Sequence, residues 1–240
     1  MYLLEGNMGA GKSTLLALVK QHLAHLSVVT EPVDCWHKSD QGSSLLGHFY
    51  QDQQRWSYTM EKFTLITRVR EYLKESRQST THKIMERSIY SGYYCFAKNG
   101  YLQGTMTEAE WSAYNLWFEF LVKESCKTPT GFIYLYTTPD VCFERMHKRK
   151  RSGEEIVPLS YLQELHDAHE MFLIHKNGTL AELTNVPVLR LDVCKEFVND
   201  PQETTRILNE ISSFIAQTNQ ETICAQPLYK NAESAYFKAL

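Results

Sequence analysis

The sequence lacks the features that mark a membrane protein, a zinc or redox protein, or a strongly basic nucleic-acid binder. It has no hydrophobic run long enough to span a bilayer. Its formal net charge of −3 argues against binding nucleic acid or an anionic membrane through bulk electrostatics. Its six cysteines include no C-x-x-C pair, and its nine histidines form no H-E-x-x-H motif. The function therefore has to be sought in the motifs that remain.

The chain length and the scattered cysteines favour one domain in a reducing compartment. A chain of 240 residues suits a single α/β domain and can bury a large core without disulfides or structural metal. We interpret the cysteines as free thiols and expect a cytoplasmic protein, in the host cytoplasm or nucleus if the source is viral. Because residues 1–4 already fit a strand, we expect no signal or transit peptide.

Strand and helix patterns alternate along the chain. Strand candidates lie at 2–5, 27–30, 82–86, 132–136 and 186–191. Helical patterns cover 12–25, 45–76 with a break near 51–54, 90–99, 108–127 with Thr107 as N-cap, a segment from Pro139 into the basic stretch 147–151, 158–176 and 201–216. Residues 37–44 are expected to form a polar loop, and the segment from Gln220 lacks a clear period. This order predicts an α/β fold with a parallel, doubly wound sheet flanked by helices.

A phosphate-binding motif follows the first strand. Residues 6–13, GNMGAGKS, match G-x-x-x-x-G-K-[ST] at every fixed position, between an apolar strand and a helix. Glycines let backbone N–H groups converge on phosphate oxygens, and the helix N-terminus adds positive potential. Lys12 is predicted to bridge the β- and γ-phosphates, Ser13 to hold Mg²⁺, and Thr14 to lie beside it. The expected ATP contacts from this motif are Gly6, Asn7, Met8, Gly9, Ala10, Gly11, Lys12, Ser13 and Thr14.

Acidic and basic residues follow the next two strands. Glu31 ends the second strand, where a carboxylate can take the proton of an attacking hydroxyl. Glu86 and Arg87 end the third strand, where the acid can reach a metal and the arginine a substrate or phosphate. Taken alone, Glu31 is more simply an exposed acid, and the second pair is equally well a surface ion pair. Their shared position at strand ends is what favours a site.

A basic segment lies farther along the chain. Arg145, Arg149 and Arg151 flank two lysines and precede a short turn. Arg145 and Arg149 share one helical face, and such a segment can close over ATP as a lid at about residues 147–157. A solvated helix face or a nuclear-import signal would have a similar composition.

Together these features favour a small-molecule kinase among the P-loop proteins. No guanine-reading N-K-x-D motif is present, and a motor or transporter ATPase would usually be larger. A nucleoside monophosphate kinase and a regulatory nucleotide-binding module remain alternatives. The first needs extra arginines for a substrate phosphate, and the second would not need the intact Lys12, Ser13, Glu31 and Arg149.

The sequence resembles the deoxynucleoside kinase family from Met1 to about Ile215. The resemblance rests on six segments, namely GNMGAGKST at 6–14, EPVDCW at 31–36, RWSYT at 55–59, ERSIYS at 86–91, the basic lid, and PLSYLQELH at 158–166. It implies a P-loop kinase fold with an arginine-rich lid, in a domain spanning 1–217 followed by a tail at 218–240. It also implies transfer of the ATP γ-phosphate to the 5′-hydroxyl of a deoxynucleoside, with ATP and Mg²⁺ bound.

The resemblance also implies residue roles. Glu31 is similar to the general base, Arg87 to its neighbour at the 5′-oxygen, and Glu86 to the acid near Mg²⁺. Tyr50 and Glu154 resemble the residues that bind the sugar 3′-hydroxyl. Trp36, Phe49 and Phe96 resemble the lining of the base pocket, and Arg145, Arg149 and Arg151 the lid. The family is typically dimeric, and its pairing helices correspond to residues near 55–75 and 108–125.

Two positions depart from the family pattern. Glu61 stands where the family usually has a glutamine that pairs with the base edge, and an ionised carboxylate can only accept. It suits guanine or thymine, and it suits adenine or cytosine only when protonated. Gly92 stands where the deoxycytidine and deoxyguanosine enzymes have an aspartate that pairs with an arginine, here Arg68. A small residue leaves room near a pyrimidine 5-methyl group, and Arg68 is then expected to pair with Glu61. We therefore expect thymidine, deoxyguanosine or a broad range as substrate.

Overall fold

Five parallel strands form the sheet, as the alternating patterns predict. A computed structural model describes residues 1–33, 36, 44–78, 82–151 and 153–224. The strands are β1 (Tyr2–Gly6), β2 (Ser27–Val29), β3 (Lys83–Glu86), β4 (Gly131–Tyr136) and β5 (Val188–Asp192), in the order β2-β3-β1-β4-β5. Leu3 pairs with Met85 on one side and with Phe132 on the other, both in parallel register. The loops that follow β1, β2 and β3 therefore meet at one edge of the sheet.

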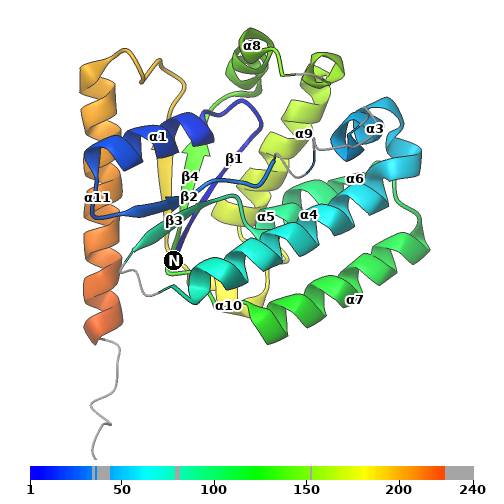
Figure 1. Cartoon of the computed structure of the whole chain (residues 1–240), viewed down its shortest axis with the longest axis horizontal. Helices are drawn as coiled ribbons and strands as arrows, with labels where there is room; N and C mark the ends of the chain where they lie inside the picture. The colour runs from blue at the N-terminus through cyan, green and yellow to red at the C-terminus, as the bar shows by residue number, and fades with distance from the viewer. Residues whose placement is uncertain (34–35, 37–43, 79–81, 152, 225–240) are drawn as a thin grey trace, which may run out of the picture.

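Side chains of the central strands alternate between two hydrophobic cores. Tyr2, Leu4 and Ile133 belong to a core that includes helices α1 (Lys12–His22) and α11 (Pro201–Cys224). Leu3 and Phe132 belong to a second core with α4 (Gln53–Ser76) and α7 (Glu108–Ser125). Figure 1 shows α1 and α11 on one side of the sheet and α4 and α7 on the other. Burial on both faces explains why β4 is a continuous apolar run.

Five further helices surround the edge of the sheet where the strands end. They are α3 (Leu45–Gln51), α5 (Ile89–Ser91), α6 (Lys98–Leu102), α8 (Pro139–Arg149) and α9 (Leu159–His169). The short α10 (Ala181–Thr184) precedes β5 and lies near the opposite edge, beside the N-terminus (Figure 1). The break predicted near 51–54 is confirmed, because Asp52 ends α3 and its side chain caps α4 at Arg55 N. Thr107 caps α7 through a capping box with Glu110, as predicted.

Several helical segments differ from the sequence prediction. Residues 90–99 were expected to form one helix, but α5 continues as a π-helix at Gly92–Ala97 before α6. The helix expected over 158–176 likewise changes to a π-helix at Glu170–Ile174. Helix α11 does not end at Ala216 but continues to Cys224, so the boundary predicted at residue 217 falls within a helix. Thr218 lies 2.6 Å from the Tyr2 hydroxyl, which attaches this part of α11 to β1.

Some sequence predictions concern residues outside the described ranges. These are most of the loop expected at 37–44 and the segment from 225 onward. Among the helices of the described ranges, none combines the length and apolar character that a bilayer crossing requires. Cys95, Cys126, Cys142 and Cys194 are free thiols, as expected.

Candidate functional site

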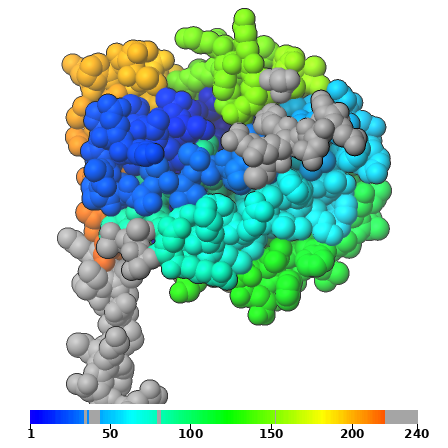
Figure 2. All heavy atoms as spheres, in the orientation of Figure 1, coloured from blue at the N-terminus to red at the C-terminus, as the bar shows by residue number. Residues whose placement is uncertain are grey.

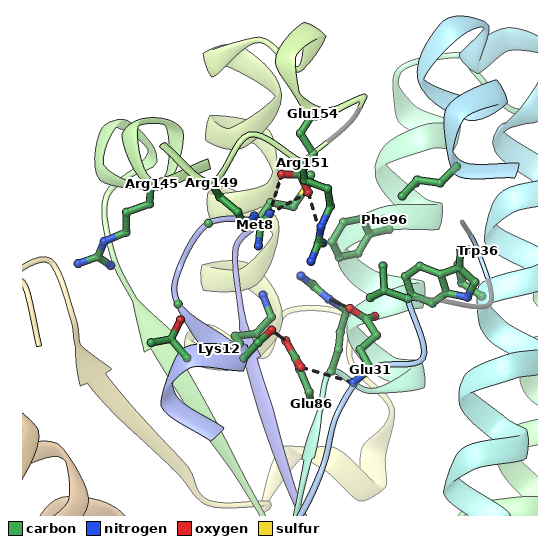
Figure 3. A pocket seen from close by; sticks show the side chains of 18 of the residues that line it. Met8, Lys12, Glu31, Trp36, Glu86, Phe96, Arg145, Arg149, Arg151 and Glu154 are labelled. Atoms are coloured by element: carbon green, nitrogen blue, oxygen red, sulfur yellow. Dashed lines mark hydrogen bonds and ion pairs between the residues drawn. The ribbon is translucent and has the colours of Figure 1, made fainter. Parts of the chain in front are cut away.

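A cleft of about 490 Å³ opens at the edge of the sheet where β1, β2 and β3 end. Figure 3 shows that side chains from the loops after these strands, from helix α8 and from the segment after it converge there. Most of the predicted site residues line it: Met8, Gly9, Gly11, Lys12, Ser13, Thr14, Glu31, Trp36, Phe49, Tyr50, Glu61, Arg68, Glu86, Arg87, Phe96, Arg145, Arg149, Arg151 and Glu154. Gly6, Asn7, Ala10 and Gly92 are not part of its lining.

The glycines of the phosphate loop occupy positions where a side chain has no space. Gly9 and Gly11 have φ values of 77° and 97°, which non-glycine residues rarely adopt. A Cβ added to Gly9 would lie 2.3 Å from the carbonyl oxygen of Cys142. Asn7 anchors the loop by donating from its amide to the Leu162 carbonyl at 2.8 Å. The turn is therefore a rigid cradle in which backbone N–H groups are available to an anion, and it fits the phosphates of ATP.

Lys12 lies within this cradle. Its Nζ donates to the backbone carbonyls of Gly6 and Asn7, at 3.0 and 2.8 Å. Burial, assisted by the positive charge of Arg87, lowers the pKa of Lys12 to about 7. Phosphate oxygens at this position would offset both effects, because negative charge favours the protonated amine.

Two oxygen ligands for a divalent cation lie next to the loop. The Ser13 hydroxyl donates to Glu86 Oε1 at 2.8 Å, and Glu86 Oε2 accepts from the Glu31 N–H at 3.4 Å. Hydroxyl and carboxylate oxygens are the donors that Mg²⁺ prefers, usually together with phosphate oxygens and water. The pair therefore fits a Mg²⁺ ion, which Ser13 and Glu86 would hold.

Glu31 forms a buried triad with two arginines. Arg68 donates from Nε and Nη2 to Glu31 Oε1, at 3.1 and 2.7 Å, and Arg87 Nε lies 3.5 Å from Oε2. The three side chains are at most 9% exposed. Burial alone would raise the pKa of Glu31, but the two guanidinium groups hold it below its usual value. Glu31 is therefore an ionised carboxylate that can accept a proton.

Arg87 is held in an unusual backbone conformation. Its φ is 60°, in the left-handed region, while its N–H donates to the Leu4 carbonyl at 2.8 Å. The guanidinium lies 4.6 Å from the centre of the Phe96 ring. Strain of this kind persists only where the surrounding structure fixes the residue, and here it directs Arg87 into the cleft.

The prediction that Arg68 pairs with Glu61 is wrong. Arg68 was predicted to pair with Glu61, seven residues earlier on the same helix, but it donates to Glu31 instead. The guanidinium also fills the space beside Gly92, where an added Cβ would lie 2.6 Å from Arg68 Nη1. The room expected there for a pyrimidine 5-methyl group is thus occupied by Arg68, and Gly92 acts on the site only through that arginine.

The lid arginines do not act as one group. Arg149 binds Glu154 at 2.6 and 2.8 Å, and Arg151 lies 3.5 Å from the same carboxylate. Arg145 instead donates to the Lys195 carbonyl at 2.8 Å and lies 5.7 Å from the Phe197 ring. Figure 3 shows Arg145 directed away from the other two. The cleft thus has separate cationic groups near Glu154 and near the loop that precedes α11.

Glu154 is close to the other residue predicted for the sugar. It is buried, and a Cβ added to the preceding Gly153 would lie 2.9 Å from the Tyr50 ring. Burial, together with the negative charge of Glu154, raises the pKa of Tyr50. Tyr50 therefore carries its proton and can donate a hydrogen bond, while Glu154 can accept one.

The sequence reasoning missed several residues of the cleft. Met60 and Thr64 lie on the same face of α4 as Glu61 and Arg68, and this helical spacing could have revealed them. Three others lie within matched segments but were not assigned to the site, namely Val33, Lys148 and Tyr161. No motif marks the remaining members of the lining, which are Leu46, Glu196, Phe197 and Val198. Val33 and Leu46 pack with Trp36, and Phe197 lies beside Arg145.

The five-stranded parallel sheet, the phosphate loop and the arginine-lined cleft define a P-loop kinase fold. A sequence model of the family described as deoxynucleoside kinase matches residues 3–216, and the chain belongs to this family of ATP-dependent phosphotransferases. The mitochondrial deoxyguanosine kinase of Xenopus laevis is 35% identical over 233 residues, which cover 88% of each chain. Deoxycytidine kinase 2 of Gallus gallus is 35% identical over 235 residues, 88% of this chain and 89% of the relative. A probable deoxycytidine kinase of fowlpox virus is 34% identical over 214 residues, 89% and 87% of the two chains.

Proposed function

We propose that the protein transfers the γ-phosphoryl group of ATP to the 5′-hydroxyl of a deoxynucleoside, in nucleotide salvage for DNA synthesis. The observation that carries this proposal is the position of Glu31. Figure 3 shows Glu31 between Lys12 of the phosphate loop and Trp36 of the apolar wall. The ionised carboxylate thus lies between the phosphate loop, which can bind a triphosphate, and the apolar wall at Trp36, which can bind a planar group such as a base.

Glu31 accepts the proton of the 5′-hydroxyl while that oxygen bonds to the γ-phosphorus and the bond to the β–γ bridging oxygen breaks. Arg68 and Arg87 keep the carboxylate ionised and fix its orientation. Arg87 Nη1 is buried without a hydrogen-bond partner among the described residues, so it is free to bind the 5′-oxygen or the transferring group. The products are ADP and the deoxynucleoside 5′-monophosphate.

Other cationic residues of the cleft neutralise the negative charge of the ATP phosphates. Lys12 binds the β- and γ-phosphates, and Arg149 stabilises the negative charge of the transferring group. A bound Mg²⁺ would add charge neutralisation, and Ser13 and Glu86 are the residues that would hold it. We propose that Arg145, which lies 5.7 Å from the Phe197 ring at the other end of the phosphate loop, contacts ATP as well.

The deoxynucleoside occupies the remainder of the cleft. Tyr50 and Glu154 bind the 3′-hydroxyl, and Trp36, Phe49 and Phe96 surround the base. Glu61 faces the base edge as a hydrogen-bond acceptor, which favours deoxyguanosine and thymidine or a broad range that includes them. The predicted location is the cytoplasm, or the host cytoplasm and nucleus for a viral enzyme.

The direct test is to incubate the purified protein with ATP, Mg²⁺ and each of the four deoxynucleosides, with the matching ribonucleosides as controls. We expect 5′-monophosphate from at least deoxyguanosine or thymidine. If no deoxynucleoside yields product although ATP binds, the proposal is wrong. A preference for deoxycytidine alone would refute the specificity but not the reaction.

We also propose a homodimer that forms through α4 and α7. These helices pack side by side at the rim of the molecule, as Figures 1 and 2 show. Their outer faces carry large exposed side chains, namely Phe63, Ile66, Leu116, Trp117 and Phe120. A second copy would cover this patch through a two-fold axis, and the double substitution Leu116→Glu, Phe120→Glu should give a monomer in sedimentation experiments. A wild-type protein that sediments as a monomer would refute the dimer.

A further inference from the structure

Glu61 occupies the end of the cleft that is remote from the phosphate loop. A second cavity of about 210 Å³ adjoins this end, and four residues line both spaces: Phe49, Glu61, Phe96 and Tyr161. Residues of the phosphate loop line only the first cavity. Glu61 is 7% exposed and is the one acidic residue common to both linings. Its carboxyl group is therefore placed to meet the outer edge of a base whose sugar lies near Glu31.

Titratable and charged groups from several elements face Glu61. They are Arg68 on the same helix, Glu31 after β2, Arg87 after β3, Tyr114 on α7, and Tyr161 on α9. Glu164 of α9 lines the adjoining cavity as well and accepts from the Asn99 amide at 3.0 Å. Both guanidinium groups are already engaged by Glu31, and Glu61 makes no ion pair within the described residues. Its charge is therefore incompletely compensated.

The protonation of Glu61 changes with pH near neutrality. Burial raises the pKa of Glu61 to about 7, although Arg68 and Arg87 act in the opposite direction. The nearby negative charge of Glu31 contributes to the increase. Both the carboxylate and the carboxylic acid are thus populated at ordinary pH.

The two forms differ in what they can recognise. The carboxylate only accepts hydrogen bonds, whereas the acid offers one O–H donor and one carbonyl acceptor. The Watson–Crick edges of guanine and thymine present an N–H at the ring position that adenine and cytosine leave as an acceptor. A carboxylate can therefore bind guanine or thymine but opposes a lone pair of adenine or cytosine. The acid, with both kinds of group, can serve all four bases.

We propose that the protonation of Glu61 sets which deoxynucleosides the enzyme accepts. The acid form accepts all four bases, and the carboxylate restricts the enzyme to guanine and thymine. This inference rests on the proposed function, because it assigns the base-recognition step of the same cleft. Arg68 makes the switch possible, since its bonds to Glu31 leave Glu61 free of a fixed counter-charge.

Two substrate pairs of matched size isolate the effect. Deoxyadenosine is compared with deoxyguanosine, and deoxycytidine with thymidine, each pair as a mixture in one reaction. The ratio of the two products gives the ratio of kcat/KM, so pH effects on Glu31, the lid or ATP cancel. Between about pH 6 and pH 8 the protonated fraction of a group with a pKa of about 7 falls roughly tenfold. The adenine-to-guanine and cytosine-to-thymine product ratios should fall by the same factor.

Variants then assign the effect to this carboxyl group. Glu61→Gln has a donor and an acceptor at every pH, so its product ratios should be independent of pH and close to the wild-type ratios at the lowest pH. Glu71→Gln is the matched control, because Glu71 lies on the same helix outside both cavities and pairs with Lys74 at 2.7 Å. Its product ratios should change with pH as the wild-type ratios do.

The wild-type measurement decides the inference even if Glu61→Gln does not fold. Product ratios that stay constant from pH 6 to pH 8 in the wild type overturn it, while product formation itself still supports the kinase function. Ratios that remain pH-dependent in Glu61→Gln also overturn it, because another group then titrates. If no deoxynucleoside is phosphorylated at any pH, the proposed function fails instead.

Discussion

A methyl group added at Gly92 should separate Arg68 from Glu31. In Gly92→Ala the new Cβ lies 2.6 Å from Arg68 Nη1, whereas ordinary contact begins at 3.4 Å, so the guanidinium must retreat by roughly 0.8 Å (3.4 − 2.6). The backbone tolerates alanine, because Gly92 has an ordinary helical φ of −53°. The effect is therefore confined to the two hydrogen bonds that Arg68 donates to Glu31.

The expected magnitude follows from the hydrogen bond that is lost. A hydrogen bond between charged groups contributes about 1.5–3 kcal/mol, and a retreat of this size stretches the 2.7 Å bond beyond its effective range. The preference of a helix for alanine over glycine, about 1 kcal/mol, adds to the folding stability but leaves the activation barrier unchanged. A loss of about 1.5–3 kcal/mol at the proposed catalytic carboxylate corresponds to a decrease in kcat of about 10- to 150-fold.

The assay is a double-mutant cycle with Arg68→Met. Methionine removes the guanidinium, so Gly92→Ala in the Arg68→Met background should leave kcat unchanged and slightly raise the melting temperature. In the wild-type background the same substitution should lower kcat while ATP affinity stays the same. Equal effects of Gly92→Ala in both backgrounds, or full activity of the single variant, would refute the coupling of Gly92 to Glu31.

Three further predictions concern the catalytic base, the phosphate cradle and the sugar site. Glu31→Gln should lower kcat by about 10²- to 10⁴-fold without weakening ATP binding measured by calorimetry, and a smaller loss would argue against a general base. Gly9→Ala places a Cβ 2.3 Å from the backbone oxygen of Cys142, so calorimetry should show at least a roughly tenfold loss of ATP affinity. Tyr50→Phe should raise KM for the deoxynucleoside by about 2- to 10-fold, with little change in kcat. For a substrate that lacks the 3′-hydroxyl, wild type and Tyr50→Phe should have the same KM. If the increase in KM persists with that substrate, Tyr50 does not bind the 3′-hydroxyl.

Features governed by local pattern could be predicted from the sequence. The strand–loop–helix context of residues 6–13, the N-cap at Thr107 and the helix break near Asp52 depend on neighbouring residues, and all agree with the structure. The family membership and the ATP-dependent class of enzyme, inferred from six matched segments, are confirmed by the family match. The convergence of Glu31, Glu86 and Arg87 in one cleft follows from the parallel sheet, because parallel strands end at the same edge.

Features that depend on long-range packing were missed or wrong. No residue type in Gly92–Ala97 marks a π-helix, so the hydrophobic pattern predicted an ordinary α-helix there. Arg68 on α4 bonds to Glu31 in the loop after β2, which is 37 residues away in the sequence. Helix spacing cannot predict a contact between such distant residues. The continuation of α11 beyond Ala216 is held by contacts such as Thr218 with Tyr2, whereas the sequence from Gln220 has no clear period.

The pairing of Arg68 with Glu31 has a consequence for how this enzyme can change its substrates over evolutionary time. One side chain on α4 both holds Glu31, the proposed catalytic base, and lines the same cleft as Glu61, the proposed base-recognition residue. On this proposal, a mutation that reshapes the cleft by replacing Arg68 would also disturb proton transfer, so selectivity could not change at that position without a loss of turnover. Glu61, which makes no ion pair within the described residues, would then be the position through which new selectivity can arise in a single step.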